Sequence, residues 1–314
     1  MRIAFFGVPD LGVIGLNTLM QNNADIVVAI PPSPSNAGHE YMTSVILNHN
    51  IPVLSFNKSP REPEFIASFK EFKPDVAIIG AFDNKLPKEL IEIPPLGFIN
   101  FHPSLLPEYR GGNPYFHVIL NNEKKTGVTA HYMDEGFDTG DIITQVEINI
   151  AGDETFGTLL SKLNRQSAEI MIEIVKKLEN GESLPRKKQI KEGDFKTAPI
   201  IRLFKGDNII NWSKDAFYIN RFVRACNPIY ASISSFRGHK IAIWAGMYSE
   251  KHKDINIKPG TIVNVSGDSI AVATGKGLFF PTVIQCDYFI TDIKDFIRRT
   301  DIKAGEIFIS ELSE

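Results

Sequence analysis

Short apolar runs alternate with amphipathic stretches over the first half of the chain. Residues 2–7, 25–30 and 75–79 are runs rich in Ile, Val, Phe and Ala, which is typical of strands buried on both faces of a sheet. Further strands are predicted at residues 52–56, 98–102 and 127–133, and helices at residues 11–20, 43–48, 64–72 and 156–178. Strands that alternate with helices predict an α/β domain with a parallel-rich sheet.

The pattern changes toward the last third of the chain. Residues 181–196 are polar, basic and interrupted by Gly and Pro, which predicts an exposed linker. One helix is predicted at residues 215–225, and short runs of Val, Ile and Phe separated by turn residues then predict a small β-barrel or sandwich. We therefore expect a first domain at residues 1–184, a linker at 185–202 and a second domain at 203–314.

The composition is that of a globular protein. Of 314 residues, 43% are hydrophobic and 23% are charged, which excludes a disordered, collagen-like or disulfide-rich chain. No apolar run reaches the length of a membrane span, and the chain starts directly with a predicted strand, so we expect a cytoplasmic protein without a signal peptide. The net charge is −3, so any contact with RNA has to come from a local basic patch.

A glycine-rich turn follows the first predicted strand, where dinucleotide-binding folds hold a phosphate. Its glycines are Gly7, Gly12 and Gly15, with Pro9 between them, and this spacing does not match G-x-G-x-x-G. A nucleotide-dependent oxidoreductase or epimerase would fit the fold but needs that motif. We interpret the turn as a tight connection between a strand and a helix.

The densest group of polar residues lies at 97–114, around the end of the predicted strand 98–102. Alternation along this strand puts Asn100 and His102 on one face, at the carboxyl end, where open α/β sheets bind their ligands. A lone histidine there is more simply explained as hydrogen-bonded within a turn. The presence of Asn100 beside it favours a functional site.

A second polar loop, residues 133–141, follows the predicted strand 127–133 and contains three aspartates. Two interpretations are a solvated turn and a cation loop, but the spacing does not match the EF-hand pattern. We favour a third, in which one carboxylate orients His102, because a histidine base needs a partner that fixes its tautomer. Neither a nucleophile motif beside His102 nor a cluster of metal ligands is found, so we expect no covalent catalysis and no metal.

Two segments together resemble the signature of the folate-dependent formyltransferases. They are residues 100–107 (NFHPSLLP) and 134–141 (DEGFDTGD), and weaker similarities extend over nearly the whole chain at residues 4–10, 197–199, 210–212 and 224–228. The resemblance implies a Rossmann-like first domain and an open, OB-like β-barrel as the second. It also implies transfer of a formyl group from 10-formyltetrahydrofolate, as co-substrate, to a primary amine.

The resemblance assigns roles to particular residues. The catalytic residues of the family correspond to Asn100, His102 and Asp138. Asn100 and His102 would donate hydrogen bonds to the negative charge that develops on the formyl oxygen, and Asp138 would raise the basicity of His102. The implied folate-binding residues are Phe82, Leu86, Pro87, Ser104, Leu105, Leu106, Pro107, Gly136 and Asp141.

The acceptor of the formyl group is less clearly marked. Family members that act on methionyl-tRNA carry a long basic loop after the second strand, whereas residues 31–40 here (PPSPSNAGHE) contain no Lys or Arg. The second domain nevertheless resembles theirs, so we expect the methionyl amine of initiator methionyl-tRNA as acceptor. The alternatives are a nucleotide-linked amino sugar and a non-catalytic RNA-binding role, although the latter would require a disrupted catalytic set. The basic residues expected at an RNA are Arg186, Lys187, Lys188, Arg221, Arg224, Arg237 and Lys240.

Overall fold

The computed structural model describes residues 1–190, 193–251, 257–286 and 289–310. The chain forms two compact units, each of which is described by itself. The first unit comprises Met1–Pro114, Lys125–Asn149 and Ser161–Ala198, and the second comprises Tyr115–Lys124, Ile150–Leu160 and Pro199–Glu314.

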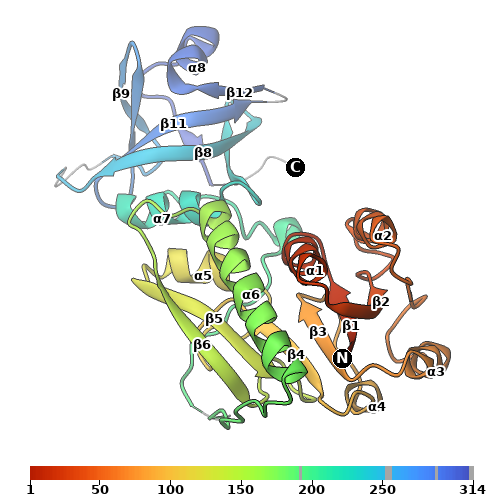
Figure 1. Cartoon of the computed structure of the whole chain (residues 1–314). Coiled ribbons are helices and arrows are strands. Elements are labelled where there is room, and N and C mark those ends of the chain that lie inside the picture. The colour runs from red at the N-terminus through yellow and green to blue at the C-terminus, as the bar shows by residue number, and fades with distance from the viewer. Residues whose placement is uncertain (191–192, 252–256, 287–288, 311–314) are drawn as a thin grey trace. The chain divides into compact units, whose positions relative to one another are not determined.

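The first unit is built on a six-stranded sheet with the order β2-β1-β3-β4-β5-β6 (Figure 1). Its strands are β1 (Arg2–Gly7), β2 (Asp25–Ile30), β3 (Val76–Gly80), β4 (Phe98–His102), β5 (Lys125–Tyr132) and β6 (Ile142–Asn149). The first four strands pair in parallel, whereas β5 pairs antiparallel with both β4 and β6. The predicted α/β class with a parallel-rich sheet is therefore confirmed, with an antiparallel edge added to it.

Two differences from the predicted strands have simple causes. Residues 52–56 form no strand: Val53 makes a single parallel bridge to Ala29, and Pro52 lacks the N–H that a longer ladder needs. The sequence analysis predicts no strand at β6, because after Ile142 and Ile143 this strand alternates half-buried and exposed residues and so lacks the continuous apolar run typical of a buried strand.

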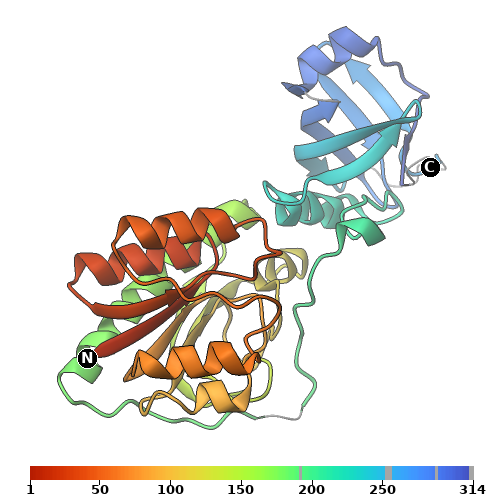
Figure 2. The same ribbon diagram turned by 90° about the vertical axis from the view of Figure 1, so that its right-hand side faces the viewer.

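Helices cover both faces of this sheet (Figure 2). On one face, Phe65 and Phe69 of α3 and Leu90 of α4 pack into a core cluster with Phe6 and Phe98. On the other face, α1 adjoins α6: a Cβ atom on Gly15 would lie 2.9 Å from Met171 Cε. The helices of the first unit are α1 (Leu11–Gln21), α2 (His39–Asn48), α3 (Pro63–Glu71), α4 (Lys88–Ile91) and most of α6 (Phe156–Glu179), whereas α5 (Pro114–Leu120) belongs almost wholly to the second unit.

The glycine-rich turn after β1 serves packing. A Cβ atom on Gly7 would lie 2.9 Å from Gly12 Cα, and one on Gly12 would lie 3.0 Å from the Gly7 backbone. The absence of side chains at both positions lets the start of α1 approach the end of β1 closely. This contact agrees with our interpretation of the turn as a tight connection.

The second unit contains a curved, seven-stranded antiparallel sheet with the order β13-β7-β8-β11-β10-β9, and β12 pairs with β11. This half-barrel confirms the predicted OB-like architecture. Buried Trp212 packs against Phe279 and Phe308 in its core, and its indole N–H donates to Ser234 Oγ at 3.0 Å. The elements are η1 (Leu203–Lys205), α7 (Ala216–Cys226), β7 (Ser232–Phe236), β8 (His239–Ser249), β9 (Ile262–Ser266), β10 (Ser269–Ala273), β11 (Leu278–Cys286), β12 (Phe289–Asp292), α8 (Ile293–Thr300) and β13 (Phe308–Ile309).

Candidate active site

The site is built on the carboxyl end of β4. Asn100 and His102 are two residues apart on this strand, so their side chains project from one face of the sheet while Ile99 and Phe101 are buried in the other. His102 is buried and Asn100 is half-buried. The predicted juxtaposition of these two polar side chains at the end of a strand is thus present in the structure.

The two ring nitrogens of His102 have different neighbours. Nε2 lies 2.8 Å from the main-chain oxygen of Tyr109, and a carbonyl oxygen only accepts hydrogen bonds, so Nε2 carries a proton. Nδ1 lies 3.5 Å from Asp138 Oδ2. Nδ1, which is not the nitrogen bound to the Tyr109 carbonyl, therefore faces the Asp138 carboxylate and is the ring nitrogen available for proton exchange.

The carbonyl that fixes His102 belongs to a residue in an uncommon conformation. Tyr109 has a φ of 59°, which is unfavourable for a bulky residue. Its own N–H donates to the Lys196 carbonyl at 2.6 Å, and the preceding turn is closed by a 2.6 Å hydrogen bond from Ser104 Oγ to the Glu108 carbonyl. These bonds hold the left-handed residue in place, and its carbonyl is thereby aimed at His102.

Asp138 is held by main-chain and side-chain contacts around the loop after β5. It has a φ of 54°, and its Oδ2 accepts the Gly111 N–H at 3.1 Å. Its main-chain oxygen accepts from Arg110 Nε at 3.2 Å and from Gln189 Nε2 at 3.0 Å. The carboxylate therefore reaches His102 from a fixed loop, which is the arrangement that the sequence predicted for one of the three aspartates.

Alanine in place of Gly111 is expected to lower the free energy of unfolding by roughly 1–3 kcal/mol and to weaken catalysis by displacing Asp138. Gly111 has a φ of 121°, and an added Cβ atom would lie 2.6 Å from the Ala198 carbonyl oxygen. Urea unfolding of the full chain measures the loss. The matched control is Gly152→Ala, where an added Cβ meets no atom within 4 Å. Equal stability of the two variants would show that the positive φ of Gly111 and its contact with the Ala198 carbonyl do not require a glycine.

His131 belongs to the site, although sequence reasoning did not identify it. It lies on β5 directly opposite Asn100 in the β4–β5 register. Its Nδ1 lies 2.8 Å from the Tyr132 carbonyl oxygen, so Nδ1 carries the proton and Nε2 is an acceptor. Asn100 Nδ2 donates to this Nε2 at 3.1 Å. The contact fixes the orientation of the Asn100 amide and leaves its second N–H for a ligand.

His131 is expected to make stability depend on pH. Burial lowers the pKa of this imidazole from 6.5 to about 4. The unfolded chain thus binds a proton that the folded chain excludes, so stability is fully present above pH 6.5 and is lost as the pH falls toward 4. The loss from this group reaches up to about 3 kcal/mol.

Urea midpoints of the wild type and of His131→Gln, measured between about pH 7.5 and 5, test this expectation. The wild type should lose more stability over this interval than the variant. Parallel pH dependences of the two proteins would show that His131 is not buried in its neutral form.

A polar network centred on buried Thr129 anchors the loop after β4. Thr129 Oγ1 donates to the Ser104 carbonyl at 2.6 Å and accepts the Leu106 N–H at 3.1 Å. Gln145 Nε2 donates to the Leu106 carbonyl and to Thr129 Oγ1, both at 2.9 Å. Ser104 and Leu106 are buried, whereas Leu105 and Pro107 are half-buried. Ser104 and Leu106 therefore support the loop, and a folate contact by their side chains stays a prediction.

The remaining predicted binding residues lie on two loops that meet. Half-buried Phe82 packs edge-on against Phe6 at 5.2 Å between ring centroids, and buried Leu86 joins the same core cluster. Pro87 directly precedes α4. On the opposing loop, Gly136 N–H donates to Asp134 Oδ1, and Asp141 accepts the Tyr132 N–H through its main-chain oxygen. Lys85 Nζ lies 5.3 Å from the centroid of the Phe137 ring, which shows that the two loops adjoin.

The predicted linker, residues 185–202, makes more contacts with the first unit than its polar composition predicts. Its side chains are mostly exposed, but Gln189 is buried and Ala198 is fully buried. Gln189 Nε2 donates to the Gly140 carbonyl at 2.7 Å, and the Arg186 guanidinium lies 3.6 Å from the centroid of the Tyr132 ring. Residues 191 and 192 lie outside the described part. The segment therefore supports the loop that carries Asp138.

Some of the basic residues predicted to contact RNA already form hydrogen bonds within the fold. Arg237 forms a two-point contact with Glu306, at 2.7 and 2.9 Å, and Arg224 donates to the Glu154 carbonyl at 2.7 Å. Burial also lowers the pKa of Arg224. Both guanidinium groups thus already donate to groups within the fold, and a contact of Arg237 or Arg224 with RNA stays a prediction.

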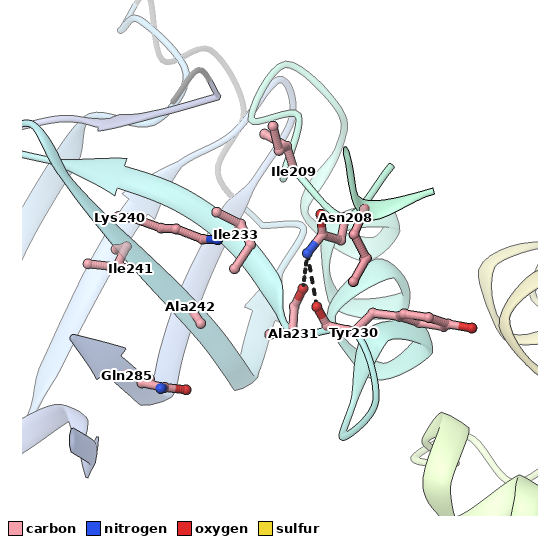
Figure 3. Close-up of a pocket in the computed structure, with 10 residues that line it drawn as sticks. Asn208, Ile209, Tyr230, Ala231, Ile233, Lys240, Ile241, Ala242 and Gln285 are labelled. Atoms are coloured by element: carbon pink, nitrogen blue, oxygen red, sulfur yellow. Dashed lines mark hydrogen bonds between the residues drawn. The ribbon is translucent and has the colours of Figure 1, made fainter. Parts of the chain in front are cut away.

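A separate cavity of about 540 Å³ lies in the second unit (Figure 3). Asn208, which lines it, uses its amide to bind the Tyr230 and Ala231 carbonyls at 2.9 Å. Lys240 is exposed and also lines this cavity, so it remains available for an anion. None of the proposed catalytic residues lines this cavity.

Neither a metal site nor a membrane span is found in the described part of the chain. No group of three or more His, Cys, Asp and Glu side chains is arranged there to hold a metal ion. Of the helices described, none combines the length and apolar character needed to cross a bilayer.

Comparison with known proteins identifies the family. The sequence pattern of the formyl transferase family matches residues 1–175, and that of the formyl transferase C-terminal domain matches residues 202–300. This chain belongs to the formyl transferase family. The methionyl-tRNA formyltransferase of Clostridioides difficile is 39% identical over 291 residues, covering 91% of this chain and 92% of the relative.

A second relative extends over almost the whole length of this formyl transferase. The methionyl-tRNA formyltransferase of Bacillus subtilis is 33% identical over 314 residues, covering 98% of this chain and 97% of the relative. The crystal structure of an N-formyltransferase from Helicobacter canadensis, in complex with folinic acid and dTDP-3-aminofucose, superimposes with a TM-score of 0.67 at 20% identity. That match covers 90% of this chain and 98% of the other, and it shows a shared fold.

Proposed function

We propose that this formyl transferase moves the formyl group of 10-formyltetrahydrofolate to the amine of initiator methionyl-tRNA. One observation carries the proposal: Asn100, His102 and Asp138 meet at the end of β4, in a chain similar over more than 90% of its length to methionyl-tRNA formyltransferases. This acceptor would also place the reaction in the cytoplasm, where charged tRNA is used.

The two adjoining loops fit a folate. A pterin is a flat ring with donors and acceptors on its edge, and a folate site must provide apolar faces together with main-chain hydrogen-bonding groups. Phe82 and Leu86 provide apolar surface on one side, and the loop at residues 134–141 provides main-chain groups on the other. When bound, 10-formyltetrahydrofolate supplies an activated formyl group.

Asn100, His102 and Asp138 have different roles in the transfer. Asn100, oriented by His131, donates its second amide N–H to the formyl oxygen as negative charge develops on it. His102 Nδ1 takes the proton that leaves the attacking amine, directly or through one water, and can return it to the folate nitrogen when the bond between that nitrogen and the formyl carbon breaks. Asp138, 3.5 Å from Nδ1, stabilises the imidazolium that this transfer creates.

One observation favours an amino-sugar nucleotide as a second candidate acceptor. The loop after β2 contains no Lys or Arg, and it is bound to an acidic residue: the Ser33 N–H and Asn36 Nδ2 donate to Asp83 at 3.1 and 3.0 Å. A carboxylate at this position repels phosphates. If methionyl-tRNA is the acceptor, its phosphates must therefore meet other residues, among them Lys187, Lys188 and Lys240.

Formylation of methionyl-tRNA is expected to fall steeply with salt, by about 0.7 to 0.9 in the log-log slope for each phosphate contact. Replacing Lys187 and Lys188 together by alanine should reduce the slope and weaken tRNA use while sparing transfer to a small amine. Arg186 is left intact, because it covers Tyr132. Lys177→Ala, at an exposed site on α6, is the control. A slope near zero for the wild type would exclude methionyl-tRNA and favour the sugar nucleotide.

A further inference from the structure

A groove of about 700 Å³ lies in the first unit beside the proposed folate loops. One wall is the outer face of α3, where Pro63, Ile66, Ala67 and Lys70 follow one another at helical spacing. The opposite wall is residues 85–89 together with Glu135. Leu86 and Pro87 thus line the groove and also belong to the proposed folate-binding set.

Positive charge dominates this groove. Arg61, Lys70, Lys85 and Lys88 line it, against the two carboxylates of Glu89 and Glu135. Lys88 is neutralised by Glu92 at 3.7 Å and by Glu135 at 3.8 Å. Among the described residues, none forms an ion pair with Arg61, Lys70 or Lys85. Three exposed cations therefore surround a surface that is partly apolar.

The neighbours of these cations do not account for the excess. Glu62, next to Arg61, accepts the main-chain N–H groups of Asn57, Lys58 and Ser59. These bonds also lower the pKa of Glu62, so its carboxylate stays charged but directed at the backbone. Lys85 lies over the Phe137 ring, at the point where the two folate loops adjoin.

We propose that this groove binds the γ-linked oligoglutamate tail of the folate co-substrate. The inference rests on the proposed function, since it concerns the part of the folate that lies away from the reacting formyl group. Each added glutamyl residue brings one α-carboxylate and a short methylene chain. Arg61, Lys70 and Lys85 complement the carboxylates, and Pro63 and Ile66 complement the methylene groups.

An RNA strand fits the groove less well. Glu89 and Glu135 would oppose a continuous row of phosphates, whereas separate carboxylates can be placed at the three unpaired cations. None of the described residues that line the groove is aromatic, so none of them offers a ring on which a base could stack. If the groove binds the tail, folates with more glutamates bind more tightly than the monoglutamate.

Equilibrium binding tests the inference without relying on turnover. Calorimetry with 5-formyltetrahydrofolate, as the monoglutamate and as the pentaglutamate, gives the ratio of the two dissociation constants. Each exposed ion pair changes a binding constant by roughly 1.5- to 5-fold, so the pentaglutamate should bind about tenfold more tightly at low salt. The preference should shrink as salt is added.

The double variant Arg61→Ala/Lys70→Ala should bring the ratio to within about twofold of one, whereas Lys177→Ala should keep the wild-type ratio. In the wild type, the KM for the pentaglutamate of 10-formyltetrahydrofolate should likewise be lower than the KM for the monoglutamate. Arg61 and Lys70 are exposed, so the double variant should fold like the wild type.

Several results would overturn the inference while leaving the proposed function intact. They are a wild-type ratio of one, an unchanged ratio in the double variant, and a double variant that loses methionyl-tRNA binding instead of the tail preference. The last result would identify the groove as an RNA surface. Failure of both folates to bind would remove the proposed function itself.

Discussion

Alanine in place of His102 is expected to lower single-turnover formyl transfer by roughly 10²–10⁴-fold, because the amine then loses the base that takes its proton. Nδ1 is the nitrogen concerned, since Nε2–H is bound to the Tyr109 carbonyl. Asp138→Asn should have an effect of the same order, since an uncharged amide cannot stabilise the imidazolium. The measurement is the rate at saturating 10-formyltetrahydrofolate.

The effects of substituting His102 and Asp138 on the rate of formyl transfer should not be additive. With His102 gone, Asp138 has no imidazolium to stabilise, so the double variant should be hardly slower than His102→Ala alone. Calorimetry with 5-formyltetrahydrofolate is the control, and it should show retained folate affinity in all three variants. Near wild-type turnover in the single variants would remove both residues from the mechanism, and fully additive losses would separate their roles.

Asn100→Ala is expected to lower kcat by roughly 10²–10³-fold through loss of a donor to the formyl oxygen. Asn100→Asp should be at least as slow, because it keeps the size of the side chain but puts an acceptor where a donor is needed. His131→Gln, which removes only the group that orients the amide, should cost less than either. If Asn100→Asp retained wild-type kcat, the amide would not be the donor.

The position of the site could be predicted from the sequence because it depends on local alternation. Asn100 and His102 lie two residues apart near the end of an apolar run, and this spacing fixes their common face without knowledge of the rest of the fold. The aspartate-rich loop follows another strand, and its contact with His102 required only that the two strands be neighbours. Asp138 proved to be the aspartate concerned.

The parts of the site that could not be predicted depend on register and long-range pairing. His131 faces Asn100 only because β5 pairs antiparallel with β4 in one particular register, which composition does not reveal. Gln189 reaches the Asp138 loop from 51 residues away along the chain. Its polar neighbourhood predicts a linker, because the sequence pattern cannot show that one amide in such a segment is buried.

The number of basic residues in a segment of sequence does not show which of them are available to a ligand. Arg237 and Lys240 are alike in the sequence as members of a basic patch, and both are exposed, yet Arg237 is bound to Glu306 whereas Lys240 has no ion pair among the described residues. The cations around Arg61 and Lys70 were not singled out, because they are separated in the sequence from Lys85 and meet it only in the folded chain. Pairing in space therefore decides which charges are available to a ligand.

A competition for one labelled formyl group tests both the proposed acceptor and the role of Asp138. The enzyme, with labelled 10-formyltetrahydrofolate, is given methionyl-tRNA and a nucleotide-linked amino sugar together, and the wild type is compared with Asp138→Asn under single-turnover conditions. We expect the label on the methionyl amine of the tRNA with the wild type, and a strong reduction of this label with the variant. Label on the sugar nucleotide alone, or equal transfer by the wild type and the variant, would contradict this expectation.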